Sequence, residues 1–125
     1  MSLQHWVDNG WLRSHRTSVE EISKLFAVAD RYLADAGQNI SADGKFMATY
    51  HAALNLCSVL LYAEGYRPVR EREHYQTIQA IPLILGGDRA QDAKYLDDCR
   101  WRGMWLNMNR LASYQRVTLR SSLHS

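Results

Sequence analysis

The sequence predicts an all-α fold, a single antiparallel bundle of four to five helices. Apolar residues recur every three or four positions along most of the chain, no segment alternates convincingly with a period of two, and glycines and prolines divide the chain into segments of helical length. The 125 residues are 46% hydrophobic, so we expect one domain, residues 1–125. Its core should cover about residues 18–116, followed by a polar tail at 117–125.

The strongest helix signal lies at residues 18–36. A shorter amphipathic segment precedes it at residues 3–12, and the Asn9-Gly10 pair weakens this segment as a helix. Ser18 and Glu21 have the spacing of a capping box, and Gly37 is placed to stop the helix in the left-handed conformation. The segment therefore predicts an amphipathic helix with one apolar stripe. The stripe consists of Val19, Ile22, Leu25, Phe26, Ala29 and Leu33.

A second long helix is predicted at residues 41–64, capped by Ser41 and ended by Gly65. It is apolar on more than one face, which indicates the centre of the bundle. Residues 46–63 carry no formally charged side chain and approach the length that spans a bilayer. Several polar side chains in this stretch favour a buried core helix, so we expect no membrane association and a cytoplasmic protein.

Two further helices complete the predicted bundle. The charged loop at residues 67–73 leads to a helix at residues 74–85, in which Pro82 should introduce a kink. Asp88 can cap the last helix, which we expect to reach about residue 114. Short connections between the helices favour antiparallel neighbours.

The cysteines and histidines predict no metal or cofactor site. Cys57 and Cys99 lie in apolar-periodic stretches, where free thiols behave as small hydrophobes. The five histidines are scattered singly and lack ligand spacing. His51, in the middle of the second long helix, has no acidic partner within reach by sequence, so we expect it to be a core polar group.

Several phrases, in their order along the chain, resemble HEPN domains, a family of helical bundles. The resemblance covers roughly residues 18–116. The phrases are residues 32–36 (Tyr-Leu-Ala-Asp-Ala), 43–46 (Asp-Gly-Lys-Phe) with Tyr50, 52–54 (Ala-Ala-Leu), 63–68 (Ala-Glu-Gly-Tyr-Arg-Pro), and His74 with Thr77 and Ile78.

The resemblance implies an antiparallel bundle that forms a homodimer. Several HEPN domains pair with a small nucleotidyltransferase in toxin–antitoxin modules, which makes such an enzyme a possible partner. Active members carry an arginine followed after four to six residues by a histidine on the last long helix. Such a pair suits metal-free RNA cleavage, which needs a general base at the 2′-hydroxyl and a cation at the phosphate.

This chain departs from the HEPN pattern at that motif. The corresponding stretch, residues 109–114, has Asn109 at the arginine position and Tyr114 at the histidine position, with Arg110 directly after the asparagine. Tyrosine has a reference pKa near 10 and is a poor general base at neutral pH. We therefore expect no catalytic residues, and the alternative is a divergent endoribonuclease that uses Arg110 and Tyr114 with help from Asn109.

One literal arginine-to-histidine match falls elsewhere, at Arg67 and His74. It lies in the loop and at the start of the third main helix rather than on the last helix. Because relatives of this family also carry a histidine that opens this helix, we favour a capping or packing role for His74.

From Cys99 onward the chain carries five arginines and no acidic residue, with aromatic residues interleaved. Basic groups beside aromatic planes can hold phosphates and stack bases, and the candidate binding residues are Arg102, Trp105, Arg110 and Tyr114. The alternative is that the tryptophans fill the bundle or a dimer interface, while the arginines are solvated or paired with nearby acids. The net charge of only +2 favours this alternative.

These observations predict a non-catalytic, HEPN-like protein that acts as a homodimeric binding or regulatory partner. The system would be linked to nucleotides or nucleic acid, such as a toxin–antitoxin, stress or defence module. Weak binding of a nucleotide or single-stranded RNA is the ligand interaction that this hypothesis predicts.

Overall fold

The structure, a computed structural model, describes residues 2–70 and 73–106. This part is mostly helical, which confirms the all-α prediction, and it includes one small sheet that the sequence did not predict. The elements are α1 (Leu3–Asp8), β1 (Leu12–Ser14), α2 (Val19–Ala36), α3 (Ala42–Ala63), β2 (Tyr66–Pro68), α4 (Glu73–Gln79), α5 (Ile81–Leu85), a 3₁₀ turn (Gly87–Arg89), and a helix over residues 90–106, here called the 90–106 helix.

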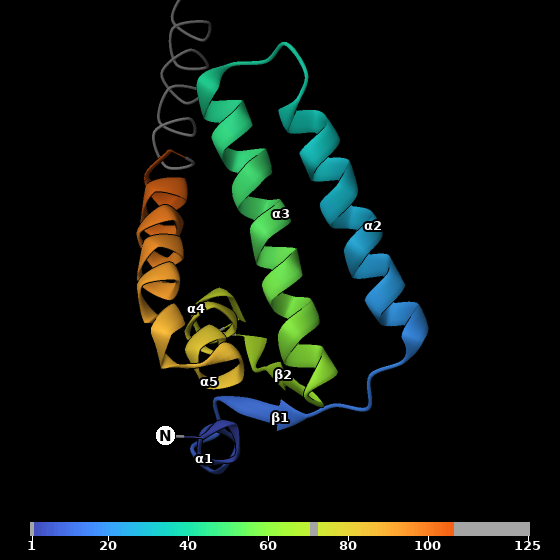
Figure 1. The fold of residues 1–125 in the computed structure, drawn as a ribbon, viewed down its shortest axis with the longest axis vertical. Helices are drawn as coiled ribbons and strands as arrows, with labels where there is room; N and C mark the ends of the chain where they lie inside the picture. The colour runs from blue at the N-terminus through green and yellow to red at the C-terminus, as the bar shows by residue number, and fades with distance from the viewer. Residues whose placement is uncertain (1, 71–72, 107–125) are drawn as a thin grey trace, which may run out of the picture.

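Helix α3 lies at the centre of the arrangement, with α2 on one side and the 90–106 helix on the other (Figure 1). Helices α4 and α5 fill the space between α3 and the 90–106 helix at one end, where α1 and the small sheet also lie. The apolar side chains of α3 therefore have neighbours on several sides, as its composition predicts.

Helix α2 begins as predicted and ends differently. The Ser18 hydroxyl accepts from the Glu21 backbone N–H at 3.1 Å, and the Glu21 carboxylate accepts from the Ser18 N–H at 3.4 Å, which completes the capping box. The predicted left-handed stop at Gly37 is wrong, because its φ is −80°. Its N–H donates to the carbonyls of both Leu33 and Ala34, so a tightened last turn ends the helix.

Helix α3 has both of its predicted ends. The Ser41 hydroxyl accepts from the Gly44 N–H at 3.0 Å, and Gly65 follows the last turn with a φ of +90°. The helix is also long and apolar enough to cross a membrane by length and composition alone, with 33% of its most apolar window buried. One such helix is weak evidence for a membrane span, because the core helix of a globular protein has the same composition.

The small sheet joins two segments that are far apart in the sequence. Strands β1 and β2 are antiparallel, with Leu12 opposite Pro68, Arg13 opposite Arg67 and Ser14 opposite Tyr66. The segment at residues 3–12 is thus helical only to Asp8, and Gly10, with a φ of +78°, turns the chain into β1.

The predicted kinked helix at residues 74–85 is two short helices, α4 and α5. Pro82 lies in the first turn of α5, where its missing N–H costs no helical hydrogen bond. Asp88, which was predicted to cap the last helix, lies in the 3₁₀ turn that precedes the 90–106 helix, and Gly86, with a φ of +117°, is the N-cap of that turn. The predicted extension of the last helix to residue 114 lies outside the described residues.

Two clusters of buried side chains form the core. One joins α3, α4, α5 and the 90–106 helix and contains Tyr50, Leu54, Cys57, Ile78, Ile81 and Ala93. The other joins α1, β1 and α3 and contains Trp6, Leu12, Leu61 and Ala80. Of the apolar stripe on α2 only Ala29 is fully buried, whereas Val19 is 83% exposed. Most of the predicted apolar stripe of α2 therefore contributes little to the core.

Candidate functional site

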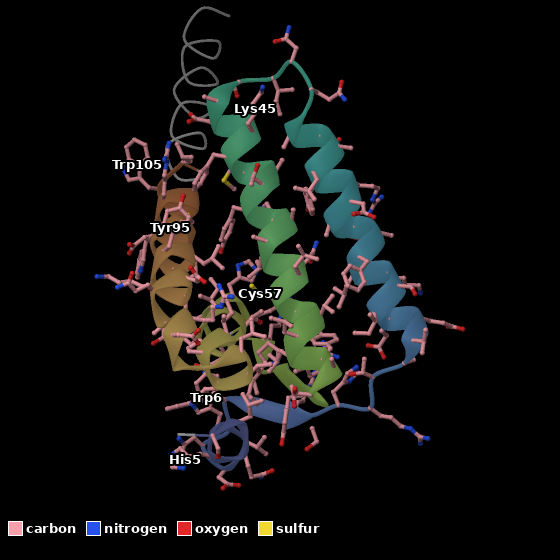
Figure 2. All side chains as sticks on the ribbon, in the orientation of Figure 1. His5, Trp6, Lys45, Cys57, Tyr95 and Trp105 are labelled. Carbon is pink, nitrogen blue, oxygen red and sulfur yellow. The ribbon has the colours of Figure 1, made fainter. Side chains whose placement is uncertain are left out.

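The 90–106 helix carries the two described members of the predicted binding set. Arg102 is exposed, and its guanidinium carbon lies 4.5 Å from the centre of the Phe46 ring on α3. Trp105 is 62% exposed and points away from α3 (Figure 2). The other members, Arg110 and Tyr114, lie outside the described residues, as does Asn109.

The tryptophans of this helix do not fill the bundle. Trp101 is 57% exposed, and Met104 and Tyr95 are also exposed. The side of the helix that faces the core instead contains Ala93, Leu96, Cys99 and the buried Gly103. Of the two interpretations of the tryptophans from the sequence, packing within the bundle is therefore wrong for the described pair.

Arg100, on the same helix, forms an ion pair with an acid. Its Nε donates to the Asp97 carboxylate at 2.9 Å, and both side chains are mostly buried. Its guanidinium also lies 4.8 Å from the Trp101 ring centre and 5.5 Å from that of Tyr75. These contacts hold Arg100 in place, so it is a structural cation rather than a free phosphate ligand.

Tyr50 lies beside this ion pair in the core. Burial raises the pKa of Tyr50 to about 12, and the positive charge of Arg100 opposes that rise only in part. Its buried hydroxyl has no hydrogen-bond partner among the described residues. A phenol that holds its proton this tightly is a poor general base at neutral pH.

His51 packs between aromatic rings. It stacks on Tyr32 with ring centres 5.2 Å apart and meets Tyr50 at 5.5 Å. Burial, followed by the nearby charge of His74, lowers the pKa of His51 below its ordinary value, so the ring is neutral at pH 7. None of the described carboxylates forms an ion pair with it, so it lacks the partner that would orient a catalytic histidine.

Arg67 and His74 form the literal arginine-to-histidine match, and each acts on a different titratable group. Arg67 lies on β2 and contributes to lowering the pKa of Glu21, although the hydrogen bond from His15 is the main cause. His74 lies on the first turn of α4 and acts on His51 instead. The structure gives no sign that the two side chains work together.

A polar cluster that was not predicted from the sequence lies where the small sheet meets α2 and α3. His15 and Glu21 form an ion pair at 2.7 Å, and the His15 ring packs against Tyr62 at 5.3 Å. The Thr17 hydroxyl donates to the Tyr62 carbonyl at 2.6 Å. The proximity of His15 to Glu21 is the one signal in the sequence that could have indicated this cluster.

The two cysteines are free thiols that differ in burial. Burial raises the pKa of Cys57 to about 11, which suppresses the reactive thiolate at neutral pH. Cys99 is a free thiol of intermediate burial. No group of three potential metal ligands occurs among residues 2–70 and 73–106.

Comparison of the chain with protein-family models, with curated proteins and with solved structures gives no match.

Proposed function

We propose that this protein is a non-catalytic, HEPN-like helical bundle that acts as a homodimeric binding or regulatory partner in a nucleotide- or nucleic-acid-linked system, such as a toxin–antitoxin, stress or defence module. The observation that carries the proposal is the outer surface of the 90–106 helix. Trp101 and Trp105 lie one helical turn apart on that surface, and both are more than half exposed.

Large aromatic side chains on an exposed helix face favour a protein interface. A solvated tryptophan leaves a large apolar area in water, and tryptophan is enriched at the centres of protein interfaces. Tyr95 and Met104 extend the apolar surface along the same helix. A second copy of the chain would cover this surface by the symmetric contact that most homodimers use.

Arg102 supports the link to nucleotides or nucleic acid. Its guanidinium is held over Phe46, and none of the described carboxylates pairs with it. A fixed, exposed and uncompensated guanidinium beside aromatic rings is suited to a phosphate or a stacked base. A small nucleotidyltransferase remains the partner that the HEPN resemblance implies.

The double variant Arg102→Glu with Arg110→Glu is expected to weaken binding of single-stranded RNA or nucleotide at least about tenfold in low salt, because two phosphate contacts become repulsive. Fluorescence anisotropy measures the binding, and circular dichroism checks the fold. The matched control is Arg16→Glu with Arg31→Glu, two exposed arginines away from the 90–106 helix. Absence of binding by the wild type, or equal binding by both double variants, would refute the role of Arg102.

A divergent metal-independent endoribonuclease that uses Arg110, Tyr114 and Asn109 is the second candidate. It is favoured by the partial match of residues 109–114 to the family motif. RNA incubated with the protein and a chelator separates the two candidates. Cleavage that Arg110→Ala abolishes would support the enzyme, whereas intact RNA supports the binding protein.

A further inference from the structure

A pocket of about 250 Å³ lies at the small sheet, away from the 90–106 helix. It is lined by Arg13, Tyr62, Arg67, Pro68, Arg70 and Glu73, and we call it the arginine pocket. Three of the six lining residues are arginines, and Glu73 is the one acidic residue among them. These residues come from both strands, the end of α3 and the start of α4.

The register of the sheet places two of these arginines directly opposite each other. Arg13 of β1 is paired with Arg67 of β2. Directly opposed residues of an antiparallel pair have Cβ atoms about 5 Å apart on the same face, where like charges repel each other. The neighbouring pair, Leu12 and Pro68, is buried on the other face of the sheet. A shift of the register by one residue would separate Arg13 from Arg67, but it would expose Leu12 and Pro68.

The three arginines of the pocket have no ion-pair partner among the described residues. The Nε atom of Arg67 is fully buried and has no hydrogen-bond partner there. Glu21, the acid near Arg67, is already engaged by His15 and by the cap of α2. A buried guanidinium N–H without an acceptor is unfavourable, so an anion bound at this atom would be stabilised.

We propose that the arginine pocket binds the phosphate dianion of a small phosphate monoester. Guanidinium groups match phosphate oxygens with pairs of parallel hydrogen bonds, and a bridging dianion would turn the repulsion between Arg13 and Arg67 into attraction. The volume is below the roughly 300–1,000 Å³ of pockets for drug-sized ligands, which favours a small ligand. This site is additional to the proposed function and depends neither on the dimer nor on Arg102.

The test is the melting temperature of the full chain with ribose 5-phosphate, compared with ribose plus sodium chloride at equal ionic strength. A concentration ten times the Kd is expected to raise the melting temperature by about 5 °C. Arg67→Ala and Arg13→Thr should each abolish that rise. Arg89→Ala removes an exposed arginine outside the pocket, so it should keep the rise.

Arg13→Thr also separates a binding role from a structural one. If Arg13 serves an anion, removing it relieves a like-charge pair, so the melting temperature without ligand should stay equal or increase. A fall in that temperature would overturn the proposal, as would a wild type that responds no more to ribose 5-phosphate than to the ribose control. A third outcome would also overturn the proposal and would indicate an RNA end as the ligand. In that outcome, a 5′-phosphorylated oligoribonucleotide binds through Arg13, and the melting temperature does not respond to ribose 5-phosphate.

Discussion

Leu61→Ala is expected to lower the free energy of unfolding by about 2–5 kcal/mol, because it removes a fully buried side chain and leaves a cavity. Leu61 is 0% exposed and packs in the cluster that also contains Trp6, Leu12 and Ala80. That cluster joins α1 and β1 to the end of α3. The loss is a large share of the roughly 5–15 kcal/mol typical of a domain, and urea denaturation followed by circular dichroism measures it.

The matched control for this prediction is Leu85→Ala at the end of α5. Leu85 is 51% exposed, so the same change should cost less than about 1 kcal/mol. Equal losses in the two variants would mean that α1 and the small sheet do not pack on α3 as described.

The double variant Trp101→Ser with Trp105→Ser is expected to raise the dimer Kd at least about a thousandfold. A symmetric dimer would lose four tryptophans, and a loss of about 4 kcal/mol in total, well within reach of buried interface tryptophans, corresponds to that factor. Both residues are exposed in the single chain, so the fold should persist. Sedimentation equilibrium over a range of concentrations measures the change.

The control variant removes exposed apolar side chains from the other side of the molecule. Val19→Ser with Leu33→Ser alters α2, whose outer residues are also largely exposed. The proposed interface predicts an unchanged dimer Kd for this variant. Dissociation of the dimer by the α2 changes, but not by the tryptophan changes, would place the interface on α2 instead.

Local signals predicted the long helices well. The boundaries of α2 and α3 follow from the N-caps Ser18 and Ser41, whose hydroxyls bond backbone groups three residues away. Gly65 was predicted to end α3, and it follows the last turn with a φ of +90°. The left-handed stop predicted at Gly37 is wrong, because a tightened last turn ends α2 instead.

The small sheet and the arginine pocket could not be predicted from the sequence. Strands of three residues are too short to show alternation. Their pairing joins β1, which precedes α2 in the sequence, to β2, which follows α3. Arg13 and Arg67 therefore carry no common signal along the chain. Single-sequence patterns report local structure, and this site depends on a non-local register.

The candidate binding surface was predicted in part. The sequence placed the tryptophans in a binding surface, in the bundle or in a dimer interface, and both Trp101 and Trp105 are exposed. It could not say whether tryptophans would pack inside or outside, because that depends on how closely the helix approaches α3. Ala93, Leu96, Cys99 and Gly103 occupy the inner side. The HEPN resemblance and the roles of Arg110 and Tyr114 stay predictions.

Sedimentation equilibrium of the unmodified chain tests the central claim most directly. A homodimer that buries the outer surface of the 90–106 helix predicts a mass of twice the 14.4 kDa chain at micromolar concentration. A mass of 14.4 kDa across that range would contradict the claim, because Trp101 and Trp105 would then remain in water without a partner copy.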